Sequence, residues 1–445
     1  MATTYLSRTP ASAGSRTTWT FSAWIKRANT STTGHQIFDC SPTPGTDESK
    51  IYFYNDFLYW KQEVGGGGAD GYLVTNRKFR DVSAWYHIVC QWNTTDATDS
   101  ERMKIWINGV QETSFSTNNL PDQNRESFIN SANAHYIGSA QGTGSNFDGQ
   151  MTHVHFIDGT AYDASTFGET DATTGIWKPK TAPSVTYGTN GFFLKFENSG
   201  AFGTDSSGNG NNFTVNGTMT QTIDTPSNVF ATLNPLVGLG SLTLSNGNLT
   251  CGNTTTAWDT ISSTIGASSG KWYSEYKWDS TSGGFIMNGI ISIDTTIDNI
   301  NSDFYIGQFS TGYGYYSDNG SSYNNGSASA YGNSYTVGDI IGIAMDLDNS
   351  KLYFSKNGTW QNSGDPTSGA TGTGAISITS GLTYAFGASN RNSAVQSINY
   401  GNGYFGTTAV SSAENPDDGI GIFEYDVPTG YRALCTKSIN AEEYD

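Results

Sequence analysis

The chain has 445 residues, enough for two or three domains, and only 14% of them are charged whereas 13% are aromatic. Its formal net charge of −18 repels phosphate groups, which argues against nucleic-acid binding and against docking on an anionic membrane. No apolar run approaches the roughly 20 residues that span a bilayer, and the first residues lack the apolar stretch of a secretion signal, so we expect neither membrane insertion nor a signal peptide.

Short alternating strands separated by turn residues fill the first half of the chain. The pattern predicts strands over residues 18–25, 50–54, 57–61, 85–92, 103–107, 135–138, 149–157, 191–197 and 213–215. Asn55 and Asp56 lie between two of these strands, which predicts a tight hairpin turn. The four glycines at residues 65–68 predict a flexible loop tip.

Pro235 and the glycines after it mark the predicted boundary between two domains, residues 1–236 and 237–445. In the second domain the pattern predicts strands over residues 241–244, 270–276, 284–293, 303–306, 340–347, 351–356, 382–386 and 395–400. Residues 310–335 differ from the rest, because they place six tyrosines among Gly, Ser and Asn.

One pattern occurs in both halves. Residues 85–109 and 340–358 each contain an alternating strand, a short polar loop, a second alternating strand and an Asn-Gly turn. Alternation turns one side of each strand towards a core, and Asn-Gly supplies the positive φ angles of a tight hairpin turn. Two such units predict an all-β fold of two tandem antiparallel β-sandwiches with almost no helix.

Both halves resemble known domain families. The second half resembles a SPRY domain in residues 270–275, 337–346, 352–358 and 384–387. The first half resembles a laminin-G-like or concanavalin-A-like domain in residues 21–26, 85–89, 105–109, 136–138 and 147–149. The first resemblance implies a bent sandwich with binding loops, and the second a jelly-roll sandwich that often binds carbohydrate and sometimes calcium.

The two domains in tandem resemble structural proteins of marine bacteriophages. The residues that carry this resemblance are 155–159, 167–169, 175–179, 205–212 and 431–435. It implies a tail fibre, head fibre or capsid-surface protein that is made in the host cytoplasm, lies on the virion surface and contacts other virion proteins. It also implies a homo-oligomer, with a trimer favoured because phage fibres are usually trimers.

Aromatic side chains are the candidate ligand contacts. In the first domain the strand aromatics are Trp60, Trp106, Tyr52 and Tyr54. Trp106 alternates with Ile105 and Ile107, which predicts an exposed ring, with burial under a neighbouring domain or subunit as the alternative.

In the second domain the candidates lie in the tyrosine-rich stretch, and they are Tyr313, Tyr315, Tyr316, Tyr323 and Tyr331. Antibody paratopes use the same mixture of Tyr with Ser, Gly and Asn, because Tyr gives a large rigid contact area. The alternative is a surface loop whose tyrosines pack back onto the sheet.

Calcium is the candidate cofactor. Asn55 with Asp56, and Asp205 with Asn209, combine the oxygen ligands that calcium coordinates, although each pair is also typical of an ordinary Asx turn. The 4 cysteines form no C-x-x-C pair, so we predict no zinc site, and Cys90 is expected to be a buried free thiol.

The predicted strands carry no pair of carboxylates two residues apart, which a glycoside hydrolase on such a sandwich would need. We therefore expect a non-enzymatic virion surface protein, a tail or head fibre or appendage that attaches to a glycan or protein of the host envelope. A purely structural capsid or tail decoration protein is the alternative, and a polysaccharide depolymerase is the third hypothesis.

Overall fold

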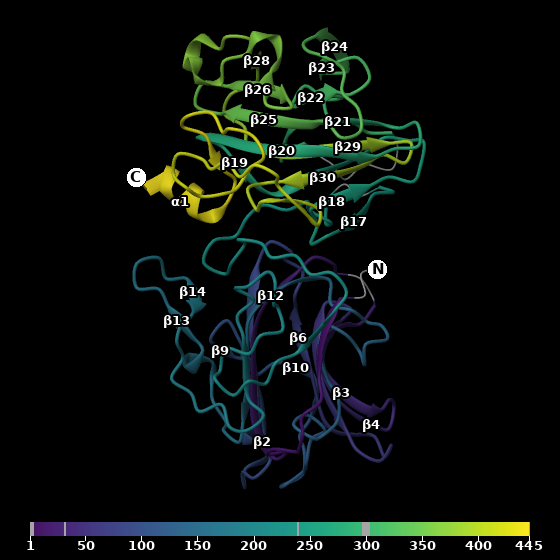
Figure 1. Cartoon of the computed structure of the whole chain (residues 1–445), viewed down its shortest axis with the longest axis vertical. Helices are drawn as coiled ribbons and strands as arrows, with labels where there is room; N and C mark the ends of the chain where they lie inside the picture. The colour runs from purple at the N-terminus through teal and green to yellow at the C-terminus, as the bar shows by residue number, and fades with distance from the viewer. Residues whose placement is uncertain (1–3, 31–32, 238–239, 296–302, 445) are drawn as a thin grey trace. The chain divides into compact units, whose positions relative to one another are not determined.

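The computed structural model in Figure 1 describes residues 4–30, 33–237, 240–295 and 303–444. Contacts divide the chain into two compact units. Unit 1 comprises residues 1–221 and 225–227, and unit 2 comprises residues 222–224 and 228–445. The domain boundary after residue 236 stays a prediction, and Gly238 and Leu239 of the predicted linker lie outside the described residues.

Unit 1 is a sandwich of two antiparallel sheets, seen as two layers in Figure 1. The strand order of the larger sheet is β10 (Phe115–Asn119), β6 (Ala69–Lys78), β5 (Phe57–Glu63), β4 (Asp47–Tyr54), β3 (His35–Thr43), β11 (His135–Ile137), β1 (Tyr5–Arg8) and β16 (Thr214–Asn216). The order of the smaller sheet is β15 (Phe192–Leu194), β12 (Gly149–Asp158), β2 (Thr18–Arg27), β7 (Trp85–Asn93), β8 (Met103–Ile107) and β9 (Val110–Gln111). A hairpin of β13 (Gly168–Thr170) and β14 (Trp177–Pro179) and the 3₁₀ turns η1 (Asp99–Glu101) and η2 (Ala164–Thr166) complete the unit.

The inward side chains of both sheets form one core in unit 1. Alternation along the strands sends Phe21 of β2, Ile51 of β4 and Ile88 of β7 into it, and all three are fully buried. Three tryptophans, Trp19, Trp60 and Trp92, fill the space between the sheets.

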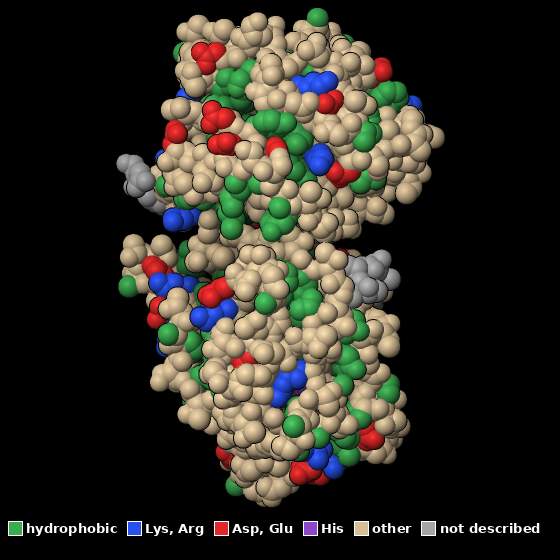
Figure 2. Space-filling model, in the orientation of Figure 1, with side chains coloured by type: hydrophobic (Ala, Val, Ile, Leu, Met, Phe, Trp, Pro, Cys, Tyr) green, Lys and Arg blue, Asp and Glu red, His purple; other side chains and the backbone are tan. Residues whose placement is uncertain are grey.

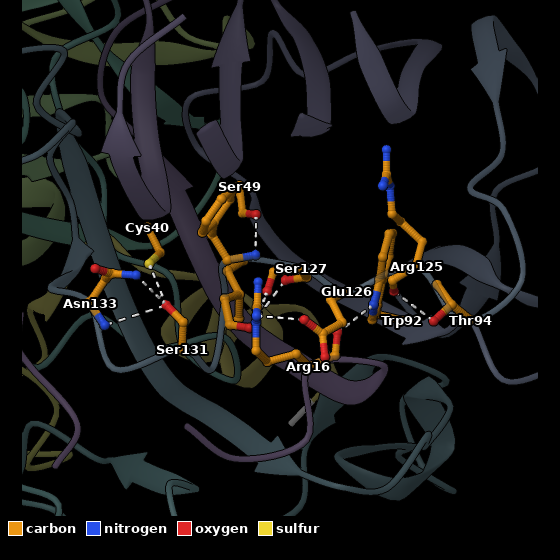
Figure 3. Close-up of polar contacts among 12 residues, drawn as sticks. Arg16, Cys40, Ser49, Trp92, Thr94, Arg125, Glu126, Ser127, Ser131 and Asn133 are labelled. Atoms are coloured by element: carbon orange, nitrogen blue, oxygen red, sulfur yellow. Dashed lines mark hydrogen bonds and ion pairs between the residues drawn. The ribbon is translucent and has the colours of Figure 1, made fainter. Parts of the chain in front are cut away.

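Residues 120–134 connect the two sheets of unit 1, as Figure 3 shows. Arg16 lies just before β2 of the smaller sheet, and its Nε–H donates to the Ser127 carbonyl at 2.7 Å. The Phe128 N–H donates to Ser49 Oγ at 2.9 Å, on β4 of the larger sheet. Because this loop bonds to both sheets, it fixes their separation at this edge.

Cys40 lies beside the same loop, with its Sγ 3.7 Å from Ser131 Oγ (Figure 3). Burial raises the pKa of the Cys40 thiol to about 12. All four cysteines are buried and free, so the prediction for Cys90 is confirmed. A buried thiol with a raised pKa is unreactive and serves as a small apolar side chain.

Unit 2 is also a sandwich. The main strand order of its larger sheet is β17 (Thr243–Ser245), β18 (Thr250–Gly252), β30 (Val395–Asn399), β20 (Lys271–Ser280), β25 (Ile340–Asp346), β26 (Lys351–Lys356) and β27 (Thr359–Trp360). Two further strands join it, β28 (Ile376–Ser377) beside β26 and β33 (Arg432–Ala433) parallel to β20. The order of the second sheet is β19 (Asp259–Ala267), β29 (Tyr384–Arg391), β21 (Phe285–Ser292), β22 (Gly312–Tyr316), β23 (Ser321–Asn324) and β24 (Ser327–Ala330). The unit also contains the hairpin β31 (Tyr404–Phe405) and β32 (Thr408–Ala409), the turns η4 (Gln361–Ser363) and η5 (Pro366–Thr371), and helix α1 (Thr436–Tyr444).

The repeated hairpin predicted from the sequence is present in both units. Asn108 and Asn357 occupy the left-handed region with φ values of 50° and 49°. Each asparagine side chain also accepts the N–H of a residue on the first strand of its hairpin, His87 on β7 at 2.7 Å and Ile340 on β25 at 2.8 Å. The all-β fold of two tandem sandwiches is therefore confirmed, and the Asn-Gly pair has the same role in each.

Two predictions of local structure in unit 2 are wrong. Residues 303–306 form no strand, because their N–H groups bond to the carbonyl of Trp258 and the hydroxyl of Ser389 instead of to a neighbouring strand. Residues 310–335 contain the strands β22, β23 and β24, so the alternative of a surface loop is wrong in its local structure, although three of its tyrosines do pack onto the core as that alternative expects. Their many Gly, Ser and Asn residues serve the tight turns between these strands.

Candidate functional site

Trp60 and Trp106 are both buried, which corrects the expectation of an exposed ring. Trp60 points into the core of unit 1, where its ring lies 5.6 Å from that of Trp19 and is closed to solvent. Trp106 does point away from that core, but Phe167 and Trp177 pack over it and leave only 9% of it exposed. Alternation predicts which face a side chain occupies, but a segment distant in sequence decides whether that face is covered.

Three of the five tyrosine candidates in unit 2 belong to its core. Tyr313, Tyr315 and Tyr331 are buried, and the Tyr315 ring stacks on Phe354 at 5.3 Å. The Tyr331 hydroxyl accepts the N–H of Phe354 at 3.0 Å. The interpretation of these three rings as a paratope-like surface is corrected in favour of the alternative, in which the tyrosines pack back onto the sheet. Strand β22 turns Tyr313 and Tyr315 between the sheets, and Tyr331, which follows β24, packs against Phe354.

Tyr316 and Tyr323 lie on the opposite face of the same sheet and are partly exposed. They form an aromatic patch with Trp258, Tyr305 and Phe285, in which the rings of Trp258 and Tyr316 are 5.7 Å apart. The binding role of Tyr316 and Tyr323 stays a prediction.

Asn55 and Asp56 form the predicted turn, with φ values of 49° and 68°. The Asp56 carboxylate accepts a hydrogen bond from Arg80 Nε at 2.7 Å and lies 3.6 Å from Arg27 Nη1. Two guanidinium groups therefore hold the carboxylate that was proposed to bind calcium, and their charge repels a cation.

Asp205 and Asn209 organise a loop. Asp205 accepts four hydrogen bonds of 2.8–2.9 Å, from the N–H groups of Phe193, Ser207 and Asn211 and from the Ser207 hydroxyl. The Asn209 amide donates to two glycine carbonyls. Donors already occupy the oxygens that calcium would need, and among the described residues no three His, Cys, Asp or Glu side chains are grouped to hold a metal ion.

We predict that Asp205→Ala destabilises unit 1 by about 2–3 kcal/mol, because buried N–H groups lose their acceptor. Urea unfolding of the full chain measures this change. In the same assay, calcium or EDTA is expected to leave the wild-type transition unchanged. A calcium-dependent stabilisation that Asp205→Ala removes would contradict this prediction.

The outer face of the larger sheet in unit 1 carries a row of tyrosines. Ile51, Phe53, Leu58 and Trp60 point inward, so the alternate residues of β4 and β5 point outward. These outward residues and one neighbour on β6 form the tyrosine row, Tyr52, Tyr54, Tyr59 and Tyr72.

The rings of the tyrosine row are in contact and partly open to solvent. Tyr59 lies at the centre, with ring distances of 5.1 Å to Tyr52, 5.8 Å to Tyr54 and 6.2 Å to Tyr72. Tyr54 is 40% exposed, and the other three are half-buried. Burial and the nearby Tyr72 hydroxyl raise the pKa of Tyr52, so its phenol is a neutral donor and acceptor at ordinary pH.

A polar depression of about 320 Å³ opens beside the tyrosine row. Strands β3 and β4 form one part of its lining and the loop of residues 138–148 another. The polar side chains that line it include Gln36, Asp39, Glu48, Lys50, Tyr52 and Gln141. This volume is at the lower end of the about 300–1,000 Å³ typical of small-ligand sites, and Tyr52 belongs to both the depression and the tyrosine row.

The pKa values of the two acidic groups in the depression, Glu48 and Asp39, are shifted in opposite directions. Burial acts to raise the pKa of Glu48, but hydrogen bonds from Lys50 and Lys61 outweigh it and lower the pKa below its ordinary value. Burial raises the pKa of Asp39 to about 6, against the opposing effect of hydrogen bonds from Ser41 and Gln36. A carboxyl group with a perturbed pKa in a concave site is a functional candidate.

Charged side chains are scattered over the face shown in Figure 2, where acidic and basic groups lie among many uncharged ones. This pattern is not the continuous basic surface that a phosphate backbone needs. Among the described residues, no helix combines the length and the apolar composition that crossing a bilayer requires.

Comparisons with known families agree with the two sandwiches. Residues 2–166 match the model of the concanavalin A-like lectin/glucanases superfamily, and residues 271–401 match the model of the SPRY domain. The chain carries a concanavalin A-like domain followed by a SPRY domain. Domains of both kinds are generally binding modules and are typically non-catalytic.

Solved structures of low sequence identity are similar to parts of the chain. The SPRY domain of human HERC1 has 15% identity and a TM-score of 0.29, over 37% of this chain and 96% of that one. The TRIM65 PSpry domain has 13% identity and a TM-score of 0.30, over 38% and 88%. A heptameric SAP-like pentraxin from Limulus polyphemus has 19% identity and a TM-score of 0.27, over 36% and 71%. No curated protein matches the sequence.

The concanavalin A-like domain contains the tyrosine row and the polar depression. Tyr52 and Tyr54 were identified from the sequence as strand aromatics, whereas Tyr59, Tyr72 and Asp39 were missed. The alternation of side chains along a strand could have identified Tyr59, because it stands between the apolar Leu58 and Trp60 and therefore points to the opposite face from them. No local signal could find the depression, because residues about a hundred positions apart line it.

Proposed function

We propose that the protein is a non-enzymatic binding protein whose concanavalin A-like domain holds carbohydrate on the outer face of β3 to β6. The tyrosine row beside the polar depression is the observation that carries this proposal. Partly exposed aromatic rings offer flat apolar surfaces to the C–H groups of a sugar ring, and the depression offers hydrogen-bond partners to its hydroxyls.

The sequence resemblance to structural proteins of marine bacteriophages supports a place on a virion surface. The protein would then be a tail or head fibre or appendage that attaches to a glycan of the host envelope. Its neighbours would be other virion proteins, and as a fibre it would form a homo-oligomer, with a trimer favoured.

Truncation of the tyrosine row tests the proposal. Tyr59→Ala is expected to weaken binding to immobilised neutral polysaccharides by about tenfold or more, because Tyr59 contacts every other ring of the row. Retention on a panel of mannan, laminarin, galactan, chitosan, alginate and polygalacturonate measures the effect for the full chain.

Tyr404→Ala is the matched control, because Tyr404 is a half-buried tyrosine of unit 2 outside both aromatic surfaces, and it should leave retention unchanged. Loss of retention in Tyr316→Ala, with Tyr59→Ala unaffected, would assign binding to the SPRY domain and contradict the proposal. Absence of binding to every polysaccharide and to host cells would favour a purely structural decoration protein.

A further inference from the structure

Four rings of the aromatic patch in unit 2 form a closed cycle. The ring of Trp258, just before β19, lies 5.7 Å from that of Tyr316 on β22, and the Tyr316 ring lies 5.7 Å from that of Tyr323 on β23. Tyr305 completes the cycle, with ring distances of 5.9 Å to Tyr323 and 6.0 Å to Trp258. Each ring therefore has two neighbours in the cycle at nearly the same distance.

Successive rings of the cycle stand at steep angles to one another, as the walls of a box do. The plane of Tyr323 is inclined at 88° to that of Tyr316 and at 89° to that of Tyr305. The plane of Trp258 is inclined at 65° to that of Tyr316 and at 51° to that of Tyr305. In a square cycle with sides of this length, the centre lies about 4 Å from each ring centroid, which is within the about 6 Å over which a ring face attracts a cation.

The cycle has a buried inner side and a rim that solvent reaches. Met287 and Ile306 belong to the same apolar cluster as Trp258, and all three are buried. The three tyrosines of the cycle, in contrast, are each partly exposed. Three of the four rings can therefore be reached from solvent, and the buried side chains close the cycle towards the sheet.

The charged groups beside the cycle are mainly acidic. The Asp303 carboxylate accepts the backbone N–H of Trp258 at 2.7 Å. Burial and the charge of Asp318 raise the pKa of Tyr316 to about 12, against the opposing charge of Arg391. The Nε–H of Arg391 donates to a backbone carbonyl at 2.8 Å. Two carboxylates and one guanidinium leave a net negative charge beside neutral rings whose faces attract cations.

We propose that this cycle is an aromatic cage that binds a methylated ammonium group, carried by a methylated lysine side chain of a partner protein. The ring faces attract the positive charge, and the methyl groups pack against the apolar walls. The Phe285 ring, 5.8 Å from that of Tyr316, offers an apolar surface to the aliphatic stem of the lysine. A phosphocholine headgroup fits less well, because its phosphate would meet Asp303 and Asp318. The cage is a second binding site, additional to the carbohydrate site proposed in unit 1.

Calorimetric titration of the full chain tests the proposal, with choline as the first probe and dimethylbutanol as its uncharged carbon isostere. The two probes have the same shape, so the difference in their affinities measures the attraction of the charge to the rings. Wild type should bind choline at least about tenfold more tightly than the isostere. A peptide with trimethyllysine should bind more tightly than its unmethylated form, and phosphocholine should bind more weakly than choline.

Tyr323→Leu should weaken choline binding by about tenfold or more, because leucine keeps an apolar side chain on β23 but has no aromatic face. Tyr323→Phe, which restores the ring, should recover most of the binding. Tyr404→Leu is the matched control, because Tyr404 is a half-buried tyrosine of unit 2 outside the aromatic patch, and it should leave binding unchanged. The comparison of choline with its isostere needs no substitution, so it decides the matter even if Tyr323→Leu fails to fold.

Three outcomes would overturn the proposal. Equal affinity of wild type for choline and its isostere would show that the cycle is only an apolar surface. Tighter binding to phosphatidylcholine vesicles than to the trimethyllysine peptide would assign the cage to a lipid headgroup. Absence of binding to both choline and the peptide at millimolar concentration would show that the cycle takes no methylated ammonium group. None of these outcomes depends on glycan retention, so the cage and the carbohydrate function are tested separately.

Discussion

Glu275→Ala is expected to destabilise unit 2 by roughly 3–5 kcal/mol. Glu275 lies on β20 and is fully buried. One carboxylate oxygen accepts the N–H of Tyr425 at 2.9 Å and the hydroxyl of Tyr273 at 3.2 Å. The other accepts the N–H of Glu424 at 2.8 Å and the amide of Asn399 at 3.2 Å. Alanine would leave four donors without an acceptor and would release the segment around residue 424 from β20.

The size of this effect should depend on pH. Burial raises the pKa of Glu275 from its ordinary value of 4.5 to about 7. The folded protein therefore holds the proton more tightly than the unfolded chain, so the stability contributed by this carboxyl group is greatest below pH 4.5 and declines as the pH rises towards 7. The difference in unfolding free energy between wild type and Glu275→Ala should accordingly be larger at pH 5 than at pH 8.

Urea unfolding at the two pH values measures both effects, and hydrogen exchange of residues 411–435 reports whether the segment detaches. Glu414→Ala is the control, because Glu414 is an exposed carboxylate of that segment, and its cost should stay within about 0.5 kcal/mol. A Glu275→Ala protein that unfolds at the wild-type urea concentration would show that the four hydrogen bonds are not what holds the segment.

Local sequence patterns predicted many of the strands, because strand alternation and Asn-Gly turns act over a few residues, but they missed others, including the long strands β3, β6 and β19. The hairpins at Asn55 and Asn108 in unit 1 and at Asn357 in unit 2 illustrate this, since their positive φ angles are needed wherever two paired strands turn tightly. The strand predicted at residues 303–306 failed because its partners, Trp258 and Ser389, are distant in the sequence.

The candidate site was harder to predict, because exposure depends on the whole fold. Trp60 and Trp106 are candidates because they are large strand aromatics. In the structure Trp60 lies in the core, and a segment later in the chain covers Trp106. The alternation of side chains along β5 places Tyr59 on the outer face and Trp60 on the inner face. Asp39 keeps an unpaired buried oxygen because the two nearby lysines bond to glutamates instead, which only the folded structure shows.

Trp60→Ala is expected to destabilise unit 1 by about 3–5 kcal/mol, because it removes a fully buried ring from the core. The ring lies 5.6 Å from that of Trp19 and 6.1 Å from that of Trp92, so its loss leaves a cavity between two large side chains that cannot easily close. The adjacent substitution Tyr59→Ala should cost at most about 1 kcal/mol, because Tyr59 packs only against its neighbours on the outer face.

The two neighbouring residues on β5 thus separate folding from binding. Calorimetry of the full chain should show a lower unfolding temperature for unit 1 in Trp60→Ala and a nearly unchanged one in Tyr59→Ala. Glycan retention, measured well below both transitions, should show the reverse order. Trp60→Phe, which keeps an aromatic ring in the core, should recover part of the lost stability. If Trp60→Ala instead lost glycan retention while keeping its stability, Trp60 would be a ligand contact and the assignment of inner and outer faces on β5 would be wrong.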